Sequence, residues 1–255
     1  MTLQELAAAA ALIGIAVLLA WPVPILLSRA AWPAFAPARA LLLWQLIAVA
    51  GGLSMIGALW LVGLAVLPGH PVLAALPAAA LAAYLLVHLA ITVVQFERQR
   101  RRHLELLLLL SSPHPTQART RVLDDAAPVA YCLPRGIGSV TVLSQGLLDD
   151  LDADELDAVI AHERAHVEQR HEVLLVAFKA WREALPWFPI AARAESEVAA
   201  LVEMRADDSA RRSTPDAVLA RAILRVAGPT GPAEHASSRR SRHHDRFLRL
   251  GRRTP

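Results

Sequence analysis

Residues 152–171 read DADELDAVIAHERAHVEQRH, and this stretch decides the fold of the second half of the chain. Asp152, followed three positions later by Glu155, matches the capping box that starts many helices. Apolar residues then recur at helical spacing, namely Leu156, Val159, Ile160 and Val167. The stretch therefore predicts a helix that begins after Asp152 and runs to about His171.

Two histidines and a glutamate form a His-Glu-x-x-His motif inside this helix, at His162, Glu163 and His166. Positions i and i+4 lie on the same helix face, so both imidazoles can bind one metal ion. Glu163 follows the first histidine and can reach a water molecule activated by that metal. Zinc suits this set because it accepts nitrogen and oxygen ligands in a tetrahedron. The alternative is a charged helix face that carries two histidines by chance.

A second long helix, expected over residues 191–212, carries two acids with the same spacing, Glu203 and Asp207. One carboxylate can complete a zinc site with two histidines. The other can accept a hydrogen bond from a ligand imidazole and fix its tautomer. In the alternative interpretation, both acids face solvent and pair with neighbouring arginines.

Short strands precede the histidine motif, and a further helix follows the acidic one. Residues 130–133 and 138–144 favour strands, since apolar Val140 and Val142 alternate with other residues between flanking glycines. Pro215 and Asp216 can open a helix with residues 217–226 as its body. This second half of the chain is therefore an expected α+β domain with a small sheet.

The first 96 residues are strongly apolar, with Glu5, Arg29 and Arg39 as their only charged residues. Three stretches reach the length of about 20 residues that a bilayer requires. They lie near residues 6–27, 40–67 and 72–96. Pro22 and Pro24 are expected to kink the first, and the glycines of the second suit close helix packing. The first stretch could instead be a signal peptide, but it lacks a basic start.

The arginines around these stretches predict the orientation. Arg29 and Arg39 lie in the first connection, and a cluster from Arg98 to Arg102 follows the third stretch, whereas residues 68–71 carry no lysine or arginine. Basic connections stay on the cytoplasmic side of a membrane. We therefore expect a multi-pass plasma-membrane protein with its N-terminus outside and the second half of the chain in the cytoplasm.

Three segments outside the motifs allow more than one interpretation. Residues 104–110 form a short apolar run, which is either a buried helix or an interfacial segment, and residues 111–120 are expected to form a loop. Residues 173–190 are apolar but contain central charges, which are expensive in lipid. We expect an amphipathic helix against the membrane surface or the protein core, in preference to a fourth span.

The expected organisation has three parts: transmembrane helices over 1–97, a cytoplasmic domain over 98–227 and a disordered basic tail over 228–255. The net charge is +3 and the pI is 9.7. The basic clusters lie beside a membrane span and in the tail, so no direct contact with nucleic acid is expected. Cys132 is the single cysteine, which excludes an internal disulfide, and its apolar setting favours a buried thiol over a reactive one.

The region between Tyr131 and Ala210 resembles the BlaR/MecR-type family of membrane zinc metallopeptidases, and more distantly the HtpX-type membrane proteases. The matching segments are, in order, AYCLP at 130–134, VLSQGLL at 142–148, DEL at 154–156, VIAHERAH at 159–166, WFP at 187–189 and EMRAD at 203–207. Family members that sense β-lactams carry a large extracellular domain after the protease. Only 30 residues follow Arg225, so no such sensor domain is expected.

This resemblance implies a mainly α-helical membrane protein with three transmembrane helices and a zincin-like peptidase domain. One Zn²⁺ per chain would be held by His162, His166 and Glu203. Glu163 would act as the general base, and Asp207 would accept a hydrogen bond from a ligand imidazole. His171 and Arg211 are candidates to stabilise the oxyanion, although an ordinary helix surface is the stronger expectation for each.

The resemblance also implies that an extended peptide substrate binds along an edge strand. Residues 138–144 are the expected strand, with Val140, Val142 and Ser144 as contacts. The implied function is hydrolysis of a protein substrate at the cytoplasmic membrane face, with the lipid bilayer and a regulatory protein, such as a transcription repressor, as partners.

Two rival functions remain at this point. One is a structural zinc site without activity, against which the intact Glu163 argues because such a site needs no general base. The other is a membrane-tethered regulator that binds a repressor without cutting it.

Overall fold

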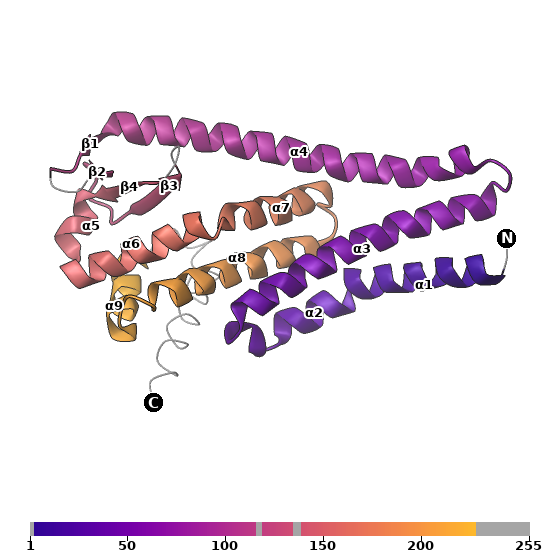
Figure 1. Cartoon of the computed structure of the whole chain (residues 1–255), viewed down its shortest axis with the longest axis horizontal. Helices are drawn as coiled ribbons and strands as arrows, with labels where there is room; N and C mark the ends of the chain where they lie inside the picture. The colour runs from indigo at the N-terminus through magenta and orange to yellow at the C-terminus, as the bar shows by residue number, and fades with distance from the viewer. Residues whose placement is uncertain (1–2, 116–118, 135–138, 228–255) are drawn as a thin grey trace. The chain divides into compact units, whose positions relative to one another are not determined.

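A computed structural model describes residues 3–115, 119–134 and 139–227 of the chain (Figure 1). The expected basic tail from Gly228 onward lies outside these residues. The described chain forms two compact units. The first contains residues up to Phe96 together with Leu174–Leu201, and the second contains Glu97–Val173 together with the chain from Val202 onward. Residues 174–201, expected within the domain at 98–227, therefore group with the N-terminal helices.

Three helical stretches of the described chain are long and apolar enough to cross a membrane, as the sequence predicts. The first consists of α1 (Leu3–Ala20) and α2 (Pro22–Arg29), and the others are α3 (Pro37–Val66) and α4 (Pro71–Leu110), with the short 3₁₀ turn η1 (Trp32–Ala34) before α3. The break between α1 and α2 falls immediately before Pro22. This kink is expected because proline lacks the N–H that continues the helical hydrogen bonds.

Glycines of α3 allow the close helix packing expected from the sequence. A Cβ atom at Gly57 would lie 3.0 Å from the side chain of Leu12 in α1, and one at Gly63 would clash with the carbonyl of Ala74 in α4. Small residues let transmembrane backbones approach each other in this way.

The first unit also contains most of α7 (His171–Ala184) and much of α8 (Pro189–Ala210). The hydroxyl of Tyr84 in α4 donates to the Ala184 carbonyl at 2.7 Å, and the hydroxyl of Thr92 donates to the Glu183 carboxylate at 2.8 Å. The segment expected to lie on the membrane surface or the protein core is thus a helix that packs against the third apolar helix. Within the described residues it does not qualify as a fourth span.

The second unit contains a mixed sheet of four strands in the order β1-β2-β4-β3. The strands are β1 (Ser111–Pro113), β2 (Thr120–Leu123), β3 (Ala130–Pro134) and β4 (Ser139–Ser144). β2 and β4 are parallel, and the outer pairs are antiparallel. The two strands predicted from the sequence, β3 and β4, are confirmed. The expected loop at 111–120 instead contributes β1 and the first residue of β2.

β4 is a central strand, so the sequence-based prediction that it is the edge for substrate is wrong. It pairs with β2 on one side and β3 on the other. Val140, Val142 and Ser144 are buried. Because both rows of its backbone hydrogen bonds are used, β4 cannot receive an added strand. The edges of this sheet are β1 and β3.

The apolar run at 104–110 is the last part of α4, which continues without a break to Leu110. Leu107 is buried in a cluster with Leu133, Val140 and Val142 of the sheet. Leu106, Leu109 and Leu110 are exposed, so the run is a helix with one buried face, and neither interpretation is confirmed for the whole segment.

α6 (Ala153–Glu168) begins at the predicted capping box. The Asp152 carboxylate accepts from the Glu155 N–H at 2.9 Å, and the Glu155 carboxylate accepts from the Asp152 N–H at 3.3 Å. The helix ends at Glu168 and not near His171, because Arg170 has a φ of 51° in the left-handed region, which α-helical geometry does not allow. α7 begins at the next residue.

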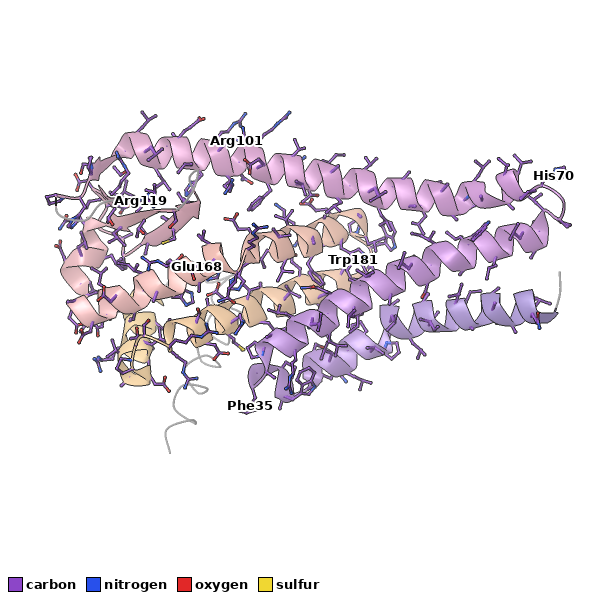
Figure 2. All side chains as sticks on the ribbon, viewed as in Figure 1. Phe35, His70, Arg101, Arg119, Glu168 and Trp181 are labelled. Atoms are coloured by element: carbon purple, nitrogen blue, oxygen red, sulfur yellow. The ribbon has the colours of Figure 1, made fainter. Side chains whose placement is uncertain are left out.

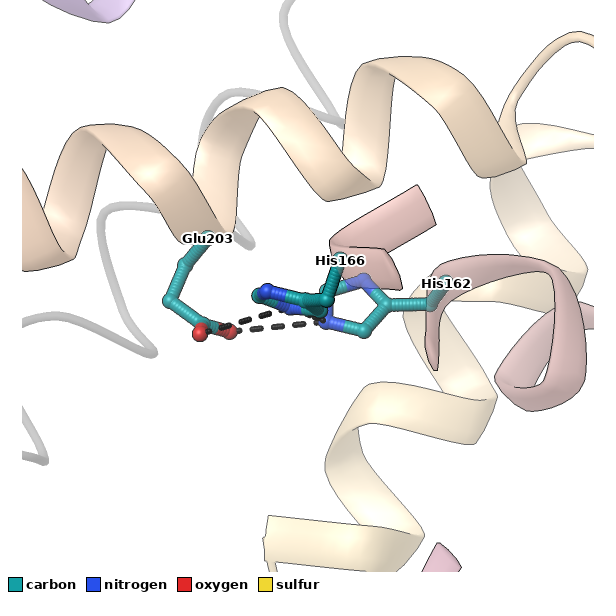
Figure 3. Close-up of side chains that lie close together, drawn as sticks. All are labelled: His162, His166 and Glu203. Carbon is teal, nitrogen blue, oxygen red and sulfur yellow. Dashed lines mark hydrogen bonds and ion pairs between the residues drawn. The ribbon is translucent and has the colours of Figure 1, made fainter. Parts of the chain in front are cut away.

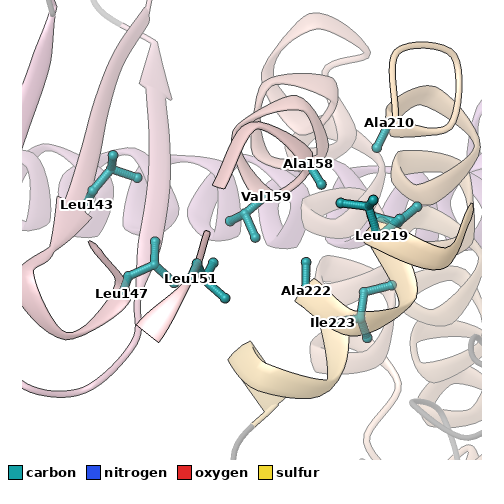
Figure 4. Close-up of a cluster of buried hydrophobic side chains, with 10 residues drawn as sticks. Leu143, Leu147, Leu151, Ala158, Val159, Ala210, Leu219, Ala222 and Ile223 are labelled. Atoms are coloured by element: carbon teal, nitrogen blue, oxygen red, sulfur yellow. The ribbon is translucent and has the colours of Figure 1, made fainter. Parts of the chain in front are cut away.

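The core of the second unit lies between β4, α6 and α9 (Asp216–Ala227), with α5 (Gln145–Asp150) beside them (Figure 4). Its buried members are Leu143, Leu147, Leu151, Ala158, Val159, Ala210, Val218, Leu219, Ala222 and Ile223. α9 matches the helix that the sequence predicts over 217–226. This core fixes α6, the helix that carries the histidine motif, against the sheet.

Candidate metal centre

α6 and α8 bring three polar side chains of the second unit together, as Figure 3 shows. The Nε2 atoms of His162 and His166 lie 3.2 Å apart. One carboxylate oxygen of Glu203 lies 3.4 Å from Nε2 of His162, and the other lies 3.6 Å from Nε2 of His166. One turn of α6 separates the two histidines, and Glu203 reaches them from α8. The spacing within the sequence motifs thus places all three ligand atoms around one point.

These separations match a tetrahedral zinc site. Bonds from zinc to nitrogen or oxygen of about 2.0–2.2 Å place neighbouring ligand atoms of a tetrahedron about 3.3–3.6 Å apart. The three donors are within 4.8 Å of one another and combine two imidazoles with one carboxylate. Three protein ligands with a fourth position left open are typical of catalytic zinc sites rather than structural ones. The residues therefore fit zinc in both geometry and chemistry.

Burial differs across the three donors. His162 is buried, with 11% of its side chain exposed, whereas the Glu203 side chain is 40% exposed. The donor set is therefore held in the protein on the side of His162 and can be reached from solvent on the side of Glu203.

Asp207 lies behind His162. It is 1% exposed, and its Oδ1 is 3.0 Å from Nδ1 of His162. Nδ1 of this imidazole faces a carboxylate while Nε2 points towards Glu203. A carboxylate at Nδ1 favours the tautomer that leaves the Nε2 lone pair available for a metal.

Comparison with known protein families agrees with this geometry. The model of peptidase family M48 matches residues 94–240, which is more than half of the chain. The chain belongs to peptidase family M48. No curated protein and no solved structure matches it. Family M48 consists of metallopeptidases, so the expected metallopeptidase class is confirmed, and the apolar helices make this M48 peptidase a membrane-associated one.

Glu163 of this M48 peptidase occupies the position after His162 on α6 and is partly buried. It is therefore carried by the same helix as the two histidines of the candidate metal centre. The structure thus keeps the predicted base on the helix that holds both histidines.

His171 is not on an ordinary helix surface, contrary to the sequence-based expectation. It is 2% exposed, and its Nδ1 lies 3.1 Å from Nδ1 of His166. Burial lowers the pKa of the His171 imidazole, which favours its neutral form. The five-residue spacing from His166 gave no sequence signal, because such a spacing on one continuous helix puts two residues on different faces.

Arg211 lies at the connection between α8 and α9. Its guanidinium donates to the carboxylate of Asp216, with Nε at 2.7 Å from Oδ1. Hydrogen bonding to Asp216 raises the pKa of Arg211. These contacts link α8 to α9, and the candidate role of Arg211 as an oxyanion donor stays a prediction.

α6, the helix that carries the histidine motif, packs against strand β3. β3 pairs with β4 on one side, and the described residues add no strand on its other side. The sequence pointed to the neighbouring strand because alternation of apolar residues identifies a strand but gives no information on its place in the sheet.

Proposed function

We propose that this M48 peptidase is a membrane-embedded zinc endopeptidase that hydrolyses peptide bonds of a protein substrate at the cytoplasmic face of the membrane. The observation that carries the proposal is the convergence of His162, His166 and Glu203, with separations of 3.2–3.6 Å that match tetrahedral zinc. Glu163 on the same helix supplies a base.

The roles follow from the chemistry of each side chain. His162, His166 and Glu203 bind the metal, which supplies Lewis acidity that polarises the scissile carbonyl and acidifies a water molecule. Glu163 removes the proton from that water and delivers it to the leaving amine. Asp207, with Oδ1 3.0 Å from Nδ1 of His162, is the carboxylate placed to orient this imidazole for ligation.

For the substrate, we propose an extended segment that pairs with β3. An edge strand offers unpaired N–H and C=O groups that a peptide can use in β-augmentation. β3 is an edge and lies against α6, whereas β4 is central. We therefore assign the substrate contacts, first expected at Val140, Val142 and Ser144, to the backbone of Ala130–Pro134.

The narrower family and the cellular setting belong to the same proposal. The segments quoted above support a BlaR/MecR-type peptidase, and the arginine asymmetry supports an N-terminus outside with the catalytic part of residues 98–227 in the cytoplasm. A regulatory protein such as a transcription repressor is the candidate substrate for this setting.

The decisive experiment replaces the base and leaves the ligands in place. Glu163→Gln should retain zinc, measured by elemental analysis, and lose cleavage of a quenched-fluorescent peptide library. The matched control is Glu168→Gln, at an exposed glutamate near the end of the same helix (Figure 2), which should keep both. Wild-type activity in Glu163→Gln would reject the proposed mechanism. Zinc without activity in the wild-type protein would favour the structural site.

A further inference from the structure

A second pair of imidazoles lies behind the donor set. His171 is the first residue of α7, and its ring meets that of His166 edge to face, at 84° between planes with 4.9 Å between centroids. The closest nitrogen atoms are the two Nδ1 atoms, which are 3.1 Å apart. This distance is that of a hydrogen bond, so one of the two atoms carries a proton and the other offers a lone pair.

The direction of this hydrogen bond follows from the orientation of His166. Its Nε2 points into the donor set, 3.2 Å from Nε2 of His162 and 3.6 Å from the Glu203 carboxylate. A neutral imidazole that ligates through Nε2 carries its proton on Nδ1. The Nδ1–H of His166 is thus the donor, and Nδ1 of His171 is the acceptor.

The acceptor role constrains the tautomer of His171. Its proton must lie on Nε2, which is buried and has no hydrogen-bond partner among the described residues. A buried donor without a hydrogen-bond partner costs free energy, and native proteins tolerate such a donor where another contact requires it. For His171, the hydrogen bond to His166 requires that the proton lie on Nε2. In this arrangement His171 is a neutral imidazole, because an imidazole accepts through Nδ1 only when that nitrogen carries no proton.

The backbone between the two histidines is arranged for this contact. Five residues of uninterrupted α-helix would turn position 171 about 140° away from position 166. α6 instead ends at Glu168, and Arg170 adopts the left-handed φ of 51°. The break redirects the chain so that His171 returns to the side of His166.

We propose that His171 is a positioning residue that accepts the Nδ1–H of His166 and holds this imidazole with Nε2 towards the metal. The inference rests on the proposed zinc site. The two ligand histidines then differ in the group beside Nδ1. His162 faces the charged carboxylate of Asp207, and His166 faces the neutral imidazole of His171. Each ligand ring then has a buried polar group beside its Nδ1 atom.

The experiment compares His171→Asn with His171→Leu. The amide oxygen of asparagine can occupy the place of Nδ1 and accept the same proton, whereas leucine has similar volume and no acceptor. We expect His171→Leu to weaken zinc binding by roughly 10- to 100-fold, the usual effect of losing a ligand's hydrogen-bond partner. His171→Asn should retain most of the affinity. Competition with a chromophoric chelator measures it.

A spectroscopic measurement separates positioning from general stability. In the cobalt-substituted protein, the visible absorption bands of His171→Leu should shift while those of His171→Asn stay close to the wild type. Thermal unfolding of the metal-free variants checks the fold. If the leucine variant does not fold, His171→Gln replaces it. The amide of glutamine lies at the place of Nε2, so this side chain offers no acceptor at the place of Nδ1.

The outcomes separate this inference from the function on which it rests. Equal zinc affinity for the asparagine and leucine variants would overturn the positioning role. A wild-type protein that binds zinc but cuts no peptide would overturn the proposed function, while the comparison of affinities would still decide the role of His171. A wild-type protein that binds no zinc would reject both.

Discussion

Asp207 and Asp208 are adjacent in α8 and have different surroundings. Asp207 is 1% exposed and contacts His162, whereas Asp208 is partly exposed and lies 3.9 Å from Arg211. We expect Asp207→Ala to weaken zinc binding by roughly 10- to 100-fold, because the His162 ring loses its acceptor. Asp208→Ala is the control and should change stability by no more than about 0.5 kcal/mol. Equal loss of zinc affinity in both variants would contradict the assignment of the α8 face with Glu203 and Asp207 as the one that faces the metal.

Cys132 is the buried thiol that the sequence favours. Burial is the main cause that raises its pKa, and its Sγ lies 3.3 Å from the Thr141 hydroxyl. A raised pKa lowers the thiolate fraction at any given pH, and the thiolate is the reactive form. Alkylation by iodoacetamide at pH 8 should therefore be much slower in the native protein than in guanidinium. Mass spectrometry measures both rates, and equal rates would refute the buried assignment.

At the residue scale, the sequence identifies those site residues that share a helix face. The i, i+4 rule pairs His162 with His166 and Glu203 with Asp207, and both pairs meet in the structure. The i, i+4 rule did not predict the contact of His171 with His166, because the position of His171 depends on the turn at Arg170. Such left-handed turns at non-glycine residues leave no periodic pattern in a sequence.

At the scale of elements, Glu155 joins the start of α6 to α9. It is fully buried, caps the Asp152 N–H and lies 3.2 Å from Nε of Arg221 and 3.5 Å from a guanidinium nitrogen of Arg225. Asp152→Ala removes a helix cap and should lower the free energy of unfolding by about 1 kcal/mol. Glu155→Ala should cost more, roughly 2–3 kcal/mol, because it also removes buried contacts and bonds to charged groups.

Urea unfolding in detergent measures these losses. Asp154→Ala is the matched control, since Asp154 lies exposed in the same first turn of α6. It should differ from the wild type by no more than about 0.5 kcal/mol. A loss in Asp154→Ala as large as that in Glu155→Ala would show that charge in the first turn, and not the link to α9, stabilises this helix.

The elements were predictable where a local signal defines them. The capping box, the first two apolar stretches and the alternation in β4 each gave an element close to its observed bounds, whereas α4 continues well beyond the third predicted stretch, to Leu110. β1 and β2 gave no such signal: β1 has three residues with Pro113 at its end, and proline is tolerated there because the strand is an edge. The place of β4 within the sheet depends on pairing between distant segments, which alternation does not encode.

At the scale of the whole molecule, orientation is the open prediction. In a chain whose Cys132 is replaced by Ser, a cysteine introduced by Ser112→Cys should not react with an impermeant reagent on intact cells. His70→Cys, in the connection without arginines, should react. Both positions are exposed, so accessibility within the protein does not limit either reaction. Labelling of the Ser112→Cys protein on intact cells would reverse the proposed orientation.

The division of the molecule into units was only partly predictable. Composition separates the apolar N-terminal part from the rest, yet residues 174–201 carry charges and still group with the apolar helices. Hydrogen bonds such as that between Thr92 and Glu183 hold them there. A hydropathy pattern measures the average surroundings of a segment and does not report which partner satisfies its polar groups.

The placement of Leu174–Leu201 between the two ligand-bearing segments has a consequence for biosynthesis. Translation at about 5–20 residues per second adds Glu203 roughly 2–7 s after His166. During this delay the nascent chain possesses two imidazoles without their carboxylate, while the residues synthesised in between join the apolar helices. The three proposed metal donors are therefore complete only after the residues between them have been synthesised.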